Sequence, residues 1–135
     1  MTLAPAYSPD LSGIVVLLVD DHADSLDVLS RALERFGATV QTAANARDAL
    51  TKACTSRPDV LVSDLSMPGD DGYALLQRVR ALGLDHDGRV PAVALTAFAR
   101  AEDRARALAA GYAVHVSKPV EPAELVEVVA RLASR

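Results

Sequence analysis

Five residues of types that could do chemistry together lie at or just after the ends of short apolar runs: Asp20, Asp21, Asp64, Thr96 and Lys118. Three clustered carboxylates are costly to hold together without a cation, and their hard oxygen ligands suit Mg²⁺. A lysine ammonium and a threonine hydroxyl are suitable partners for phosphate oxygens. A carboxylate can also attack phosphorus. The set therefore predicts a Mg²⁺ site at which Asp64 acts as both ligand and nucleophile and forms an aspartyl phosphate.

These side chains can meet only if the apolar runs are strands of one parallel sheet. The predicted strands are residues 14–19, 38–43, 60–63, 92–95 and 113–116. Helical spacing predicts helices at 23–36, 46–56, 72–82 and 101–110 and a last helix from 122, with Phe36 and Leu82 on inward faces. This alternation favours a parallel sheet covered by helices on both faces. In such sheets ligands bind at the carboxyl edge, where all five polar residues would emerge.

Each of these residues also has a simpler interpretation when it is taken alone. An Asp pair after a strand is more often a helix N-cap with a solvated neighbour than a metal site. Thr96 could be a strand-end hydroxyl, and Lys118-Pro119 could be an ordinary turn. Their shared place at one edge of the predicted sheet favours the common site.

Length and composition limit the class of protein. The chain has 135 residues, half of them hydrophobic, which predicts one globular domain. A net charge of −4 without a Lys/Arg cluster argues against direct nucleic-acid binding. The single cysteine, Cys54, fits a reducing cytosol and is predicted to be a small buried residue of a helix. No run is long enough to cross a bilayer, and residues 1–12 are predicted to form a flexible arm.

With these residues in place, the sequence over about residues 13–134 resembles the receiver domain of two-component response regulators. The resemblance rests on VDD at 19–21, SDLSMPGDDGY at 63–73, ALTAFA at 94–99 and SKPVEPAEL at 117–125. It implies a doubly wound, five-stranded parallel sheet in the flavodoxin-like order 2-1-3-4-5. The tail from 96 to 125 is particularly similar to C-terminal receivers of hybrid histidine kinases. A stand-alone regulator and an excised hybrid-kinase receiver both remain open.

The resemblance assigns a role to each acidic residue of the predicted site. Asp64 would be the phosphoacceptor. Asp21 and Asp64 would bind Mg²⁺ directly, with Mn²⁺ as an alternative ion and the backbone carbonyl of Ser66 as a further ligand. Asp20 would help through water. His22 is expected to point to solvent, because Mg²⁺ prefers oxygen ligands.

The resemblance also implies a phosphate site and a switch. Thr96 would move in to bond the phosphoryl oxygens, together with Lys118 and the backbone N–H of Ala97. His115 takes a position where the family usually has a Tyr or Phe that repacks inward. It could swing in the same way, make the response depend on pH, or have no switching role. Phe98 could slow hydrolysis by shielding the route of water, or could simply pack the loop.

The partners follow from the same resemblance. A cytoplasmic receiver takes its phosphoryl group from a histidine kinase or a histidine phosphotransfer protein, and it catalyses its own aspartyl phosphorylation and dephosphorylation. The fourth helix, fifth strand and fifth helix would form the face that signals, where a homodimer could also form. The rival from another class is a pseudo-receiver that only binds proteins. A haloacid-dehalogenase-type phosphatase would need D-x-D after the first strand, where this chain has His22 as the third residue.

Overall fold

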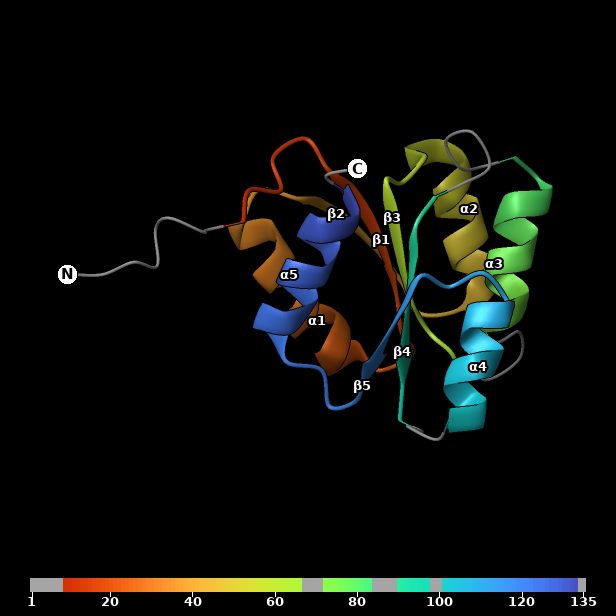
Figure 1. Ribbon diagram of the computed structural model, residues 1–135. Coiled ribbons are helices and arrows are strands. Elements are labelled where there is room, and N and C mark those ends of the chain that lie inside the picture. Colours follow the sequence, from red (N-terminus) through yellow and green to blue (C-terminus); the bar gives the residue numbers. More distant parts are fainter. Residues whose placement is uncertain (1–8, 67–71, 84–89, 98–100, 134–135) are drawn as a thin grey trace.

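The computed structural model describes residues 9–66, 72–83, 90–97 and 101–133, in which five strands alternate with five helices (Figure 1). The strands are β1 (Val15–Val19), β2 (Thr39–Ala43), β3 (Val60–Asp64), β4 (Ala92–Thr96) and β5 (Val114–Ser117). The helices are α1 (Ala23–Arg35), α2 (Ala46–Ser56), α3 (Gly72–Ala81), α4 (Ala101–Ala109) and α5 (Pro122–Ala133). Every predicted element is present, and the observed ends lie close to the predicted ones.

The five strands form one parallel sheet in the order β2-β1-β3-β4-β5, as predicted. β3 and β4 are buried along their whole length, whereas β2 and β5 at the sheet edges are partly exposed. A central strand with helices on both faces has no polar side to present, which explains the nearly continuous apolar runs. The carboxyl ends of the strands lie at the lower edge in Figure 1.

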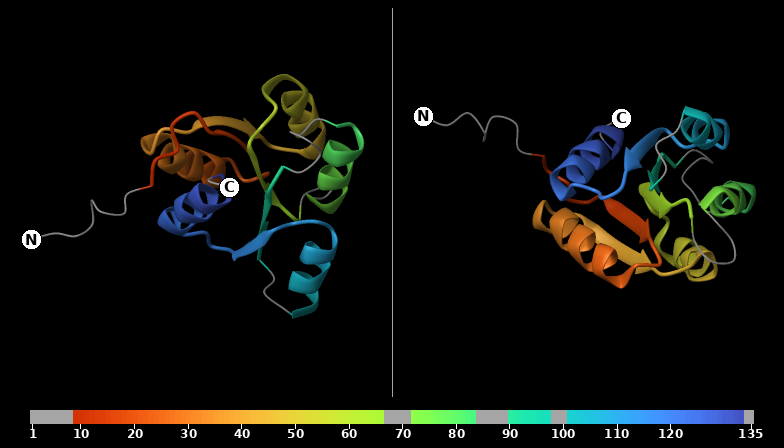
Figure 2. Two further views of the ribbon diagram at one scale, coloured as in Figure 1. Left: turned by 45° about the horizontal axis from the view of Figure 1, so that its top comes forward. Right: turned by 90° about the horizontal axis from the view of Figure 1, so that it is seen from below.

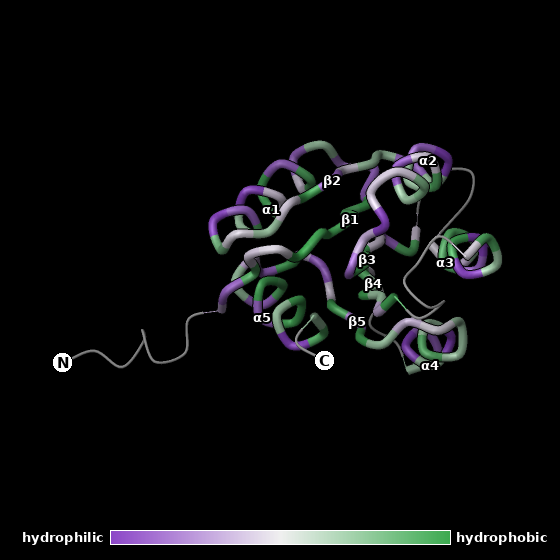
Figure 3. Tube along the Cα trace, turned by 90° about the horizontal axis from the view of Figure 1, so that it is seen from above, coloured by the Kyte–Doolittle hydropathy of each residue, from purple (hydrophilic) through white to green (hydrophobic). Residues whose placement is uncertain are grey.

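Helices cover the sheet in two layers, with α1 and α5 on one face and α2, α3 and α4 on the other (Figures 2 and 3). Alternate residues of β1 supply the two cores: Leu17 and Val19 pack towards α2–α4, and Val16 and Leu18 pack towards α1 and α5. Within the described residues, no helix is both long and apolar enough to span a membrane.

Three predictions of burial were wrong, for reasons of helix geometry. Phe36 is 37% exposed and Leu82 is 63% exposed. Both lie just past the last residue of their helices, where the helical period no longer directs a side chain to the sheet. Cys54 is exposed, because Ala53 occupies the inward face of α2 and the next residue is turned about 100° away.

The packed structure begins ahead of the first strand. Residues 1–8 of the predicted arm lie outside the described residues, but Leu11 is only 1% exposed and belongs to the core under α1 and α5. Its backbone N–H donates a hydrogen bond of 2.7 Å to the carbonyl oxygen of Phe36, just past the end of α1. Leu11 is therefore part of the folded domain.

The start of α3 lies directly against the end of β3. A Cβ atom added to Gly72 would lie 2.6 Å from the carbonyl oxygen of Asp64 and 3.1 Å from Cα of Leu65. The backbone N–H of Gly72 also donates to the carbonyl oxygen of Leu65 at 3.3 Å. Only glycine allows the helix to begin this close to Asp64.

We therefore expect Gly72→Ala to lower the free energy of unfolding by about 1–3 kcal/mol, because a backbone neighbour cannot yield as a flexible side chain would. Urea unfolding measures the change. Gln77→Ala, on the exposed side of the same helix, is the control and should stay within about 0.5 kcal/mol of the wild type. A Gly72→Ala variant as stable as the control would show that the start of α3 can move away from β3.

Candidate functional site

The fold places the predicted site residues at one edge of the sheet. Asp20 follows β1, Asp64 ends β3 and Thr96 ends β4, and these three side chains are buried, with relative exposures of 0%, 3% and 4%. Lys118 directly follows β5, and its backbone N–H donates to the carbonyl oxygen of Thr96 at 2.8 Å. The rule that strands of a parallel sheet deliver their ends to one edge thus accounts for the assembly of the site.

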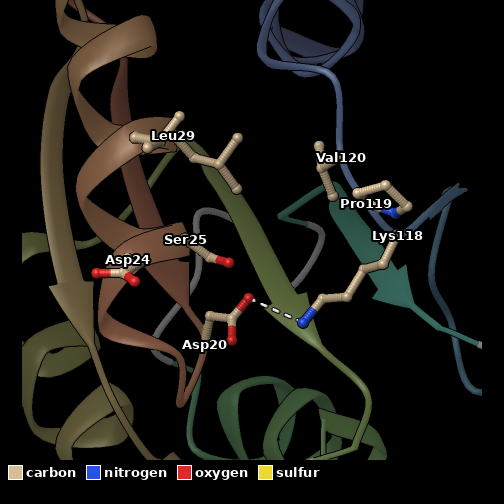
Figure 4. A pocket seen from close by; sticks show the side chains of 8 residues that line it. Asp20, Asp24, Ser25, Leu29, Lys118, Pro119 and Val120 are labelled. Carbon is tan, nitrogen blue, oxygen red and sulfur yellow. Dashed lines mark ion pairs between the residues drawn. The ribbon is translucent and has the colours of Figure 1, made fainter.

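Lys118 joins the two buried carboxylates. Its Nζ lies 3.0 Å from Oδ2 of Asp20 and 2.9 Å from Oδ2 of Asp64. Figure 4 shows the side chain reaching from the segment after β5 to Asp20. With only 19% of the lysine side chain exposed, the three charges interact with little screening by water. One ammonium therefore balances part of the charge of two acids.

Burial and hydrogen bonding act differently on the pKa values of this group. Burial raises the pKa of Asp64, and the hydrogen bonds from Lys118 and from the Ser66 backbone N–H only partly oppose it. Burial also acts to raise the pKa of Asp20, but the His22 backbone N–H and Lys118 outweigh it and lower that pKa. The pKa of Lys118 is raised, because its bonds to Asp64 and Asp20 outweigh burial. A further cation close to Asp64 would thus stabilise its charged form.

The acidic residues are close enough to hold a metal ion together. Asp20, Asp21, His22 and Asp64 each offer one ligand atom, and these atoms lie within 4.8 Å of one another. Oδ1 of Asp21 is a buried oxygen to which the described residues donate no hydrogen bond, although Nδ1 of His22 lies 3.2 Å away. Three carboxylates form a hard oxygen donor set of the kind that binds Mg²⁺. The residues present therefore fit the predicted ion.

His22 is largely exposed, as predicted, but one of its ring nitrogens faces the acids. Its side chain is 66% exposed, and Nδ1 lies within 3.0 Å of Oδ1 of Asp20. The backbone N–H of His22 donates to the same oxygen at 2.9 Å, which holds the residue beside the acids at the start of α1. The expectation that His22 points to solvent therefore holds for most of the side chain and fails for Nδ1.

The predicted phosphate and switch residues lie on β4 and β5, or directly after β4. Thr96 pairs in register with Ser117, and the exposed Ala97 follows Thr96. His115 lies beside Ala94 on β5 and is partly exposed, and its Nε2 is a buried atom without a hydrogen-bond partner among the described residues. Phe98 lies outside the described residues.

A pocket beside the acids was not predicted from the sequence. It has a volume of about 240 Å³ and lies between α1 and the segment after β5 (Figure 4). Its lining residues are Asp20, Asp24, Ser25, Val28, Leu29, Lys118, Pro119 and Val120. Val28 is 52% exposed, because it lies off the face of α1 that Leu29 and Leu33 bury. The pocket joins two segments about 90 residues apart, so local sequence patterns could not show it.

Comparison with known proteins agrees with this geometry. Residues 16–130 match the model of the response regulator receiver domain, and the chain belongs to that family. It is 44% identical over 119 residues to an uncharacterized 14.6 kDa protein of Leptolyngbya boryana, covering 88% of this chain and 89% of that one. It is also 35% identical to the hybrid signal transduction histidine kinase D of Dictyostelium discoideum, covering 85% of this chain but 8% of the kinase.

Solved structures agree on the fold. The chemotaxis protein CheY4 of Vibrio cholerae superposes with a TM-score of 0.82 at 32% identity, covering 88% of this chain and 98% of that one. The resemblance to receiver domains, including those of hybrid kinases, is thereby confirmed.

Because burial raises the pKa of Asp64, its ionised form costs the folded state stability. Below the ordinary pKa of 3.8, Asp64 is protonated in both the folded and the unfolded state, and its burial carries no cost of charge. As pH rises through the higher pKa of the folded state, the buried carboxyl group ionises and this stability is lost. We expect Asp64→Asn to raise the unfolding midpoint by a few degrees at pH 7 in a metal chelator, and to bring little gain near pH 3.5. Lys118 keeps Asp20 as a partner in this variant.

Thermal unfolding between pH 3.5 and 7 checks this expectation. Asp27→Asn, on a side chain that is 60% exposed on α1, is the matched control and should show no comparable pH-dependent gain. An Asp64→Asn variant that is destabilised at pH 7 would contradict the assigned cost of burying Asp64.

Proposed function

We propose that this chain is a Mg²⁺-dependent phosphoacceptor receiver, which takes a phosphoryl group from a phosphohistidine onto Asp64. The observation that carries the proposal is the position of Asp64: a nearly buried carboxylate held between Lys118 and other acids. A merely structural carboxylate would gain nothing from two more acids close by. A nucleophile that must bind an ion and a phosphoryl group needs this arrangement.

The chemistry requires positioning and charge balance more than further reactive groups. The P–N bond to the donor imidazole breaks as a bond forms between phosphorus and a carboxylate oxygen of Asp64, and the imidazole leaves as the neutral group after taking up a proton. Lys118, already 2.9 Å from Asp64, is placed to pair with a phosphoryl oxygen. Asp21 and Asp64 would hold a bound Mg²⁺ with Asp20 and the Ser66 carbonyl in support, and the ion would supply charge neutralisation. Attack by water on phosphorus would then break the bond between phosphorus and the Asp64 oxygen, release inorganic phosphate and restore the carboxylate.

The proposed signal passes along β4 and β5. Thr96 and the N–H of Ala97 would bond the phosphoryl oxygens, and Thr96 would move towards Asp64 to do so. His115 lies on the strand that pairs with β4, and the unpaired Nε2 leaves it free to take another position. The face formed by α4, β5 and α5 would then change its contacts with a protein partner or with a second copy of the chain.

The pocket beside the acids supports a docking site for the phosphohistidine partner. Its apolar lining, including Val28 and Val120, adjoins Asp20 and Lys118, so a partner seated there would bring its histidine to Asp64. The partner would be a cytoplasmic histidine kinase or phosphotransfer protein, and the chain would act alone or as part of a hybrid kinase.

The competing proposal is a pseudo-receiver that uses the fold only to bind proteins. Such a domain has no need of a lysine that joins two buried acids. The ion pairs of Lys118 with Asp20 and Asp64, and the closeness of Asp21 to both acids, support phosphorylation over this alternative.

Incubation with a small acyl phosphate and Mg²⁺ should add the mass of one phosphoryl group to the intact protein. Asp64→Asn should abolish the gain, because the nucleophile is removed, and a chelator should suppress it in the wild type. Asp59→Asn, at the amino end of the same strand, is the matched control and should be phosphorylated normally. No gain in the wild type under any condition would favour the pseudo-receiver.

Docking at the pocket predicts a difference between protein and small-molecule donors. Val28→Glu should slow transfer from phosphorylated histidine phosphotransfer domains of the same organism by about tenfold, since a charge would enter an apolar contact. Transfer from the small acyl phosphate should change little. Leu108→Glu on α4, at a residue 57% exposed, is the control. Equal rates for both variants with the protein donors would place docking elsewhere.

A further inference from the structure

Tyr112 is a buried aromatic residue that the proposed chemistry does not use. It is 2% exposed and lies in the core between the sheet and α2–α4. Its backbone is fixed on both sides: the N–H of Tyr112 donates to the carbonyl oxygen of Ala107 at the end of α4, and the N–H of Ala113 donates to Ala92 of β4. Gly111, with φ of +109°, makes the turn that places it there. The backbone that carries the ring is therefore held in place.

The hydroxyl group of this ring reaches the first residue of α3. It donates a hydrogen bond of 2.5 Å to the carbonyl oxygen of Gly72, forty residues away in the chain. Both groups are buried, so no water competes for the bond. The end of α4 is thus tied to the beginning of α3.

Gly72 in turn lies against the backbone of the phosphoacceptor. The space for its Cβ is closed by the carbonyl oxygen of Asp64 at 2.6 Å, and its N–H donates to Leu65. A movement of Gly72 would consequently move Asp64 or the segment that follows it. That segment includes Ser66, whose N–H donates to Oδ1 of Asp64 at 3.0 Å.

We propose that the Tyr112 hydroxyl is a positioning group for phosphorylation: by holding Gly72, it fixes Asp64 and Ser66 in the geometry that metal binding and phosphoryl transfer require. The inference rests on the proposed function of Asp64. The Tyr112 hydroxyl acts through Gly72, whose carbonyl group accepts its hydrogen bond. A displacement of about 1 Å in the reacting carboxylate is enough to slow phosphoryl transfer.

The test is Tyr112→Phe, which keeps the ring in the core and removes only the hydroxyl group. Its rate of phosphorylation by a small acyl phosphate at saturating Mg²⁺ should fall about fivefold, the equivalent of one net hydrogen bond. The concentration of Mg²⁺ needed for half the maximal rate should rise. Val129→Ala, on the buried face of α5 in the opposite core, is a control that loses stability without touching α3.

The control separates positioning from general stability. At a temperature where all three proteins are folded, the control should keep the wild-type rate and Mg²⁺ dependence even though its unfolding midpoint is lower. If Tyr112→Phe matches the wild type, or if the control loses as much rate, the hydroxyl has no positioning role. A wild type that neither binds Mg²⁺ nor becomes phosphorylated would instead overturn the proposed function, and this inference with it.

Discussion

The repulsion between buried carboxylates is the constraint on which the rest of this structure depends. Asp20 and Asp64 lie at the carboxyl ends of neighbouring strands and are buried, so water cannot solvate their charges. Lys118 relieves part of this cost, and it can do so because β5 brings it to the same edge. The negative charge that remains would favour the binding of a divalent cation, as the proposed function requires.

Positioning in this site comes from the backbone as much as from side chains. Strand register sets where Asp64 emerges, and the close contact of Gly72 with its carbonyl oxygen limits how far it can move. The two helical layers serve different ends. The layer of α2–α4 includes Gly72, which lies against the backbone of Asp64, whereas α1 borders the open pocket beside Asp20. The contact that restrains Asp64 thus lies on one face of the sheet, and the open pocket beside Asp20 lies on the other.

The sequence alone predicted the strands and helices because these depend on local order. Apolar runs and helical spacing locate strands and helices, and the parallel-sheet rule then brings Asp64 and Lys118 together without knowledge of any distance. Contacts that depend on three-dimensional fit were out of reach. The bond from Tyr112 to Gly72 and the pocket between α1 and the segment after β5 each join segments that lie far apart in the chain. No spacing rule encodes them.

Leu11 gives the domain a boundary that matters for building chimeric proteins. The side chain fills the core beneath α1 and α5, and its N–H is bonded to the chain just past the end of α1. A splice made at Gly13, directly before the first predicted strand, would leave a void under two helices and an unsatisfied carbonyl group on Phe36. A joint placed upstream of Leu11 would spare both. A chimeric protein that carries this domain therefore needs Leu11, although that residue lies outside every strand and helix.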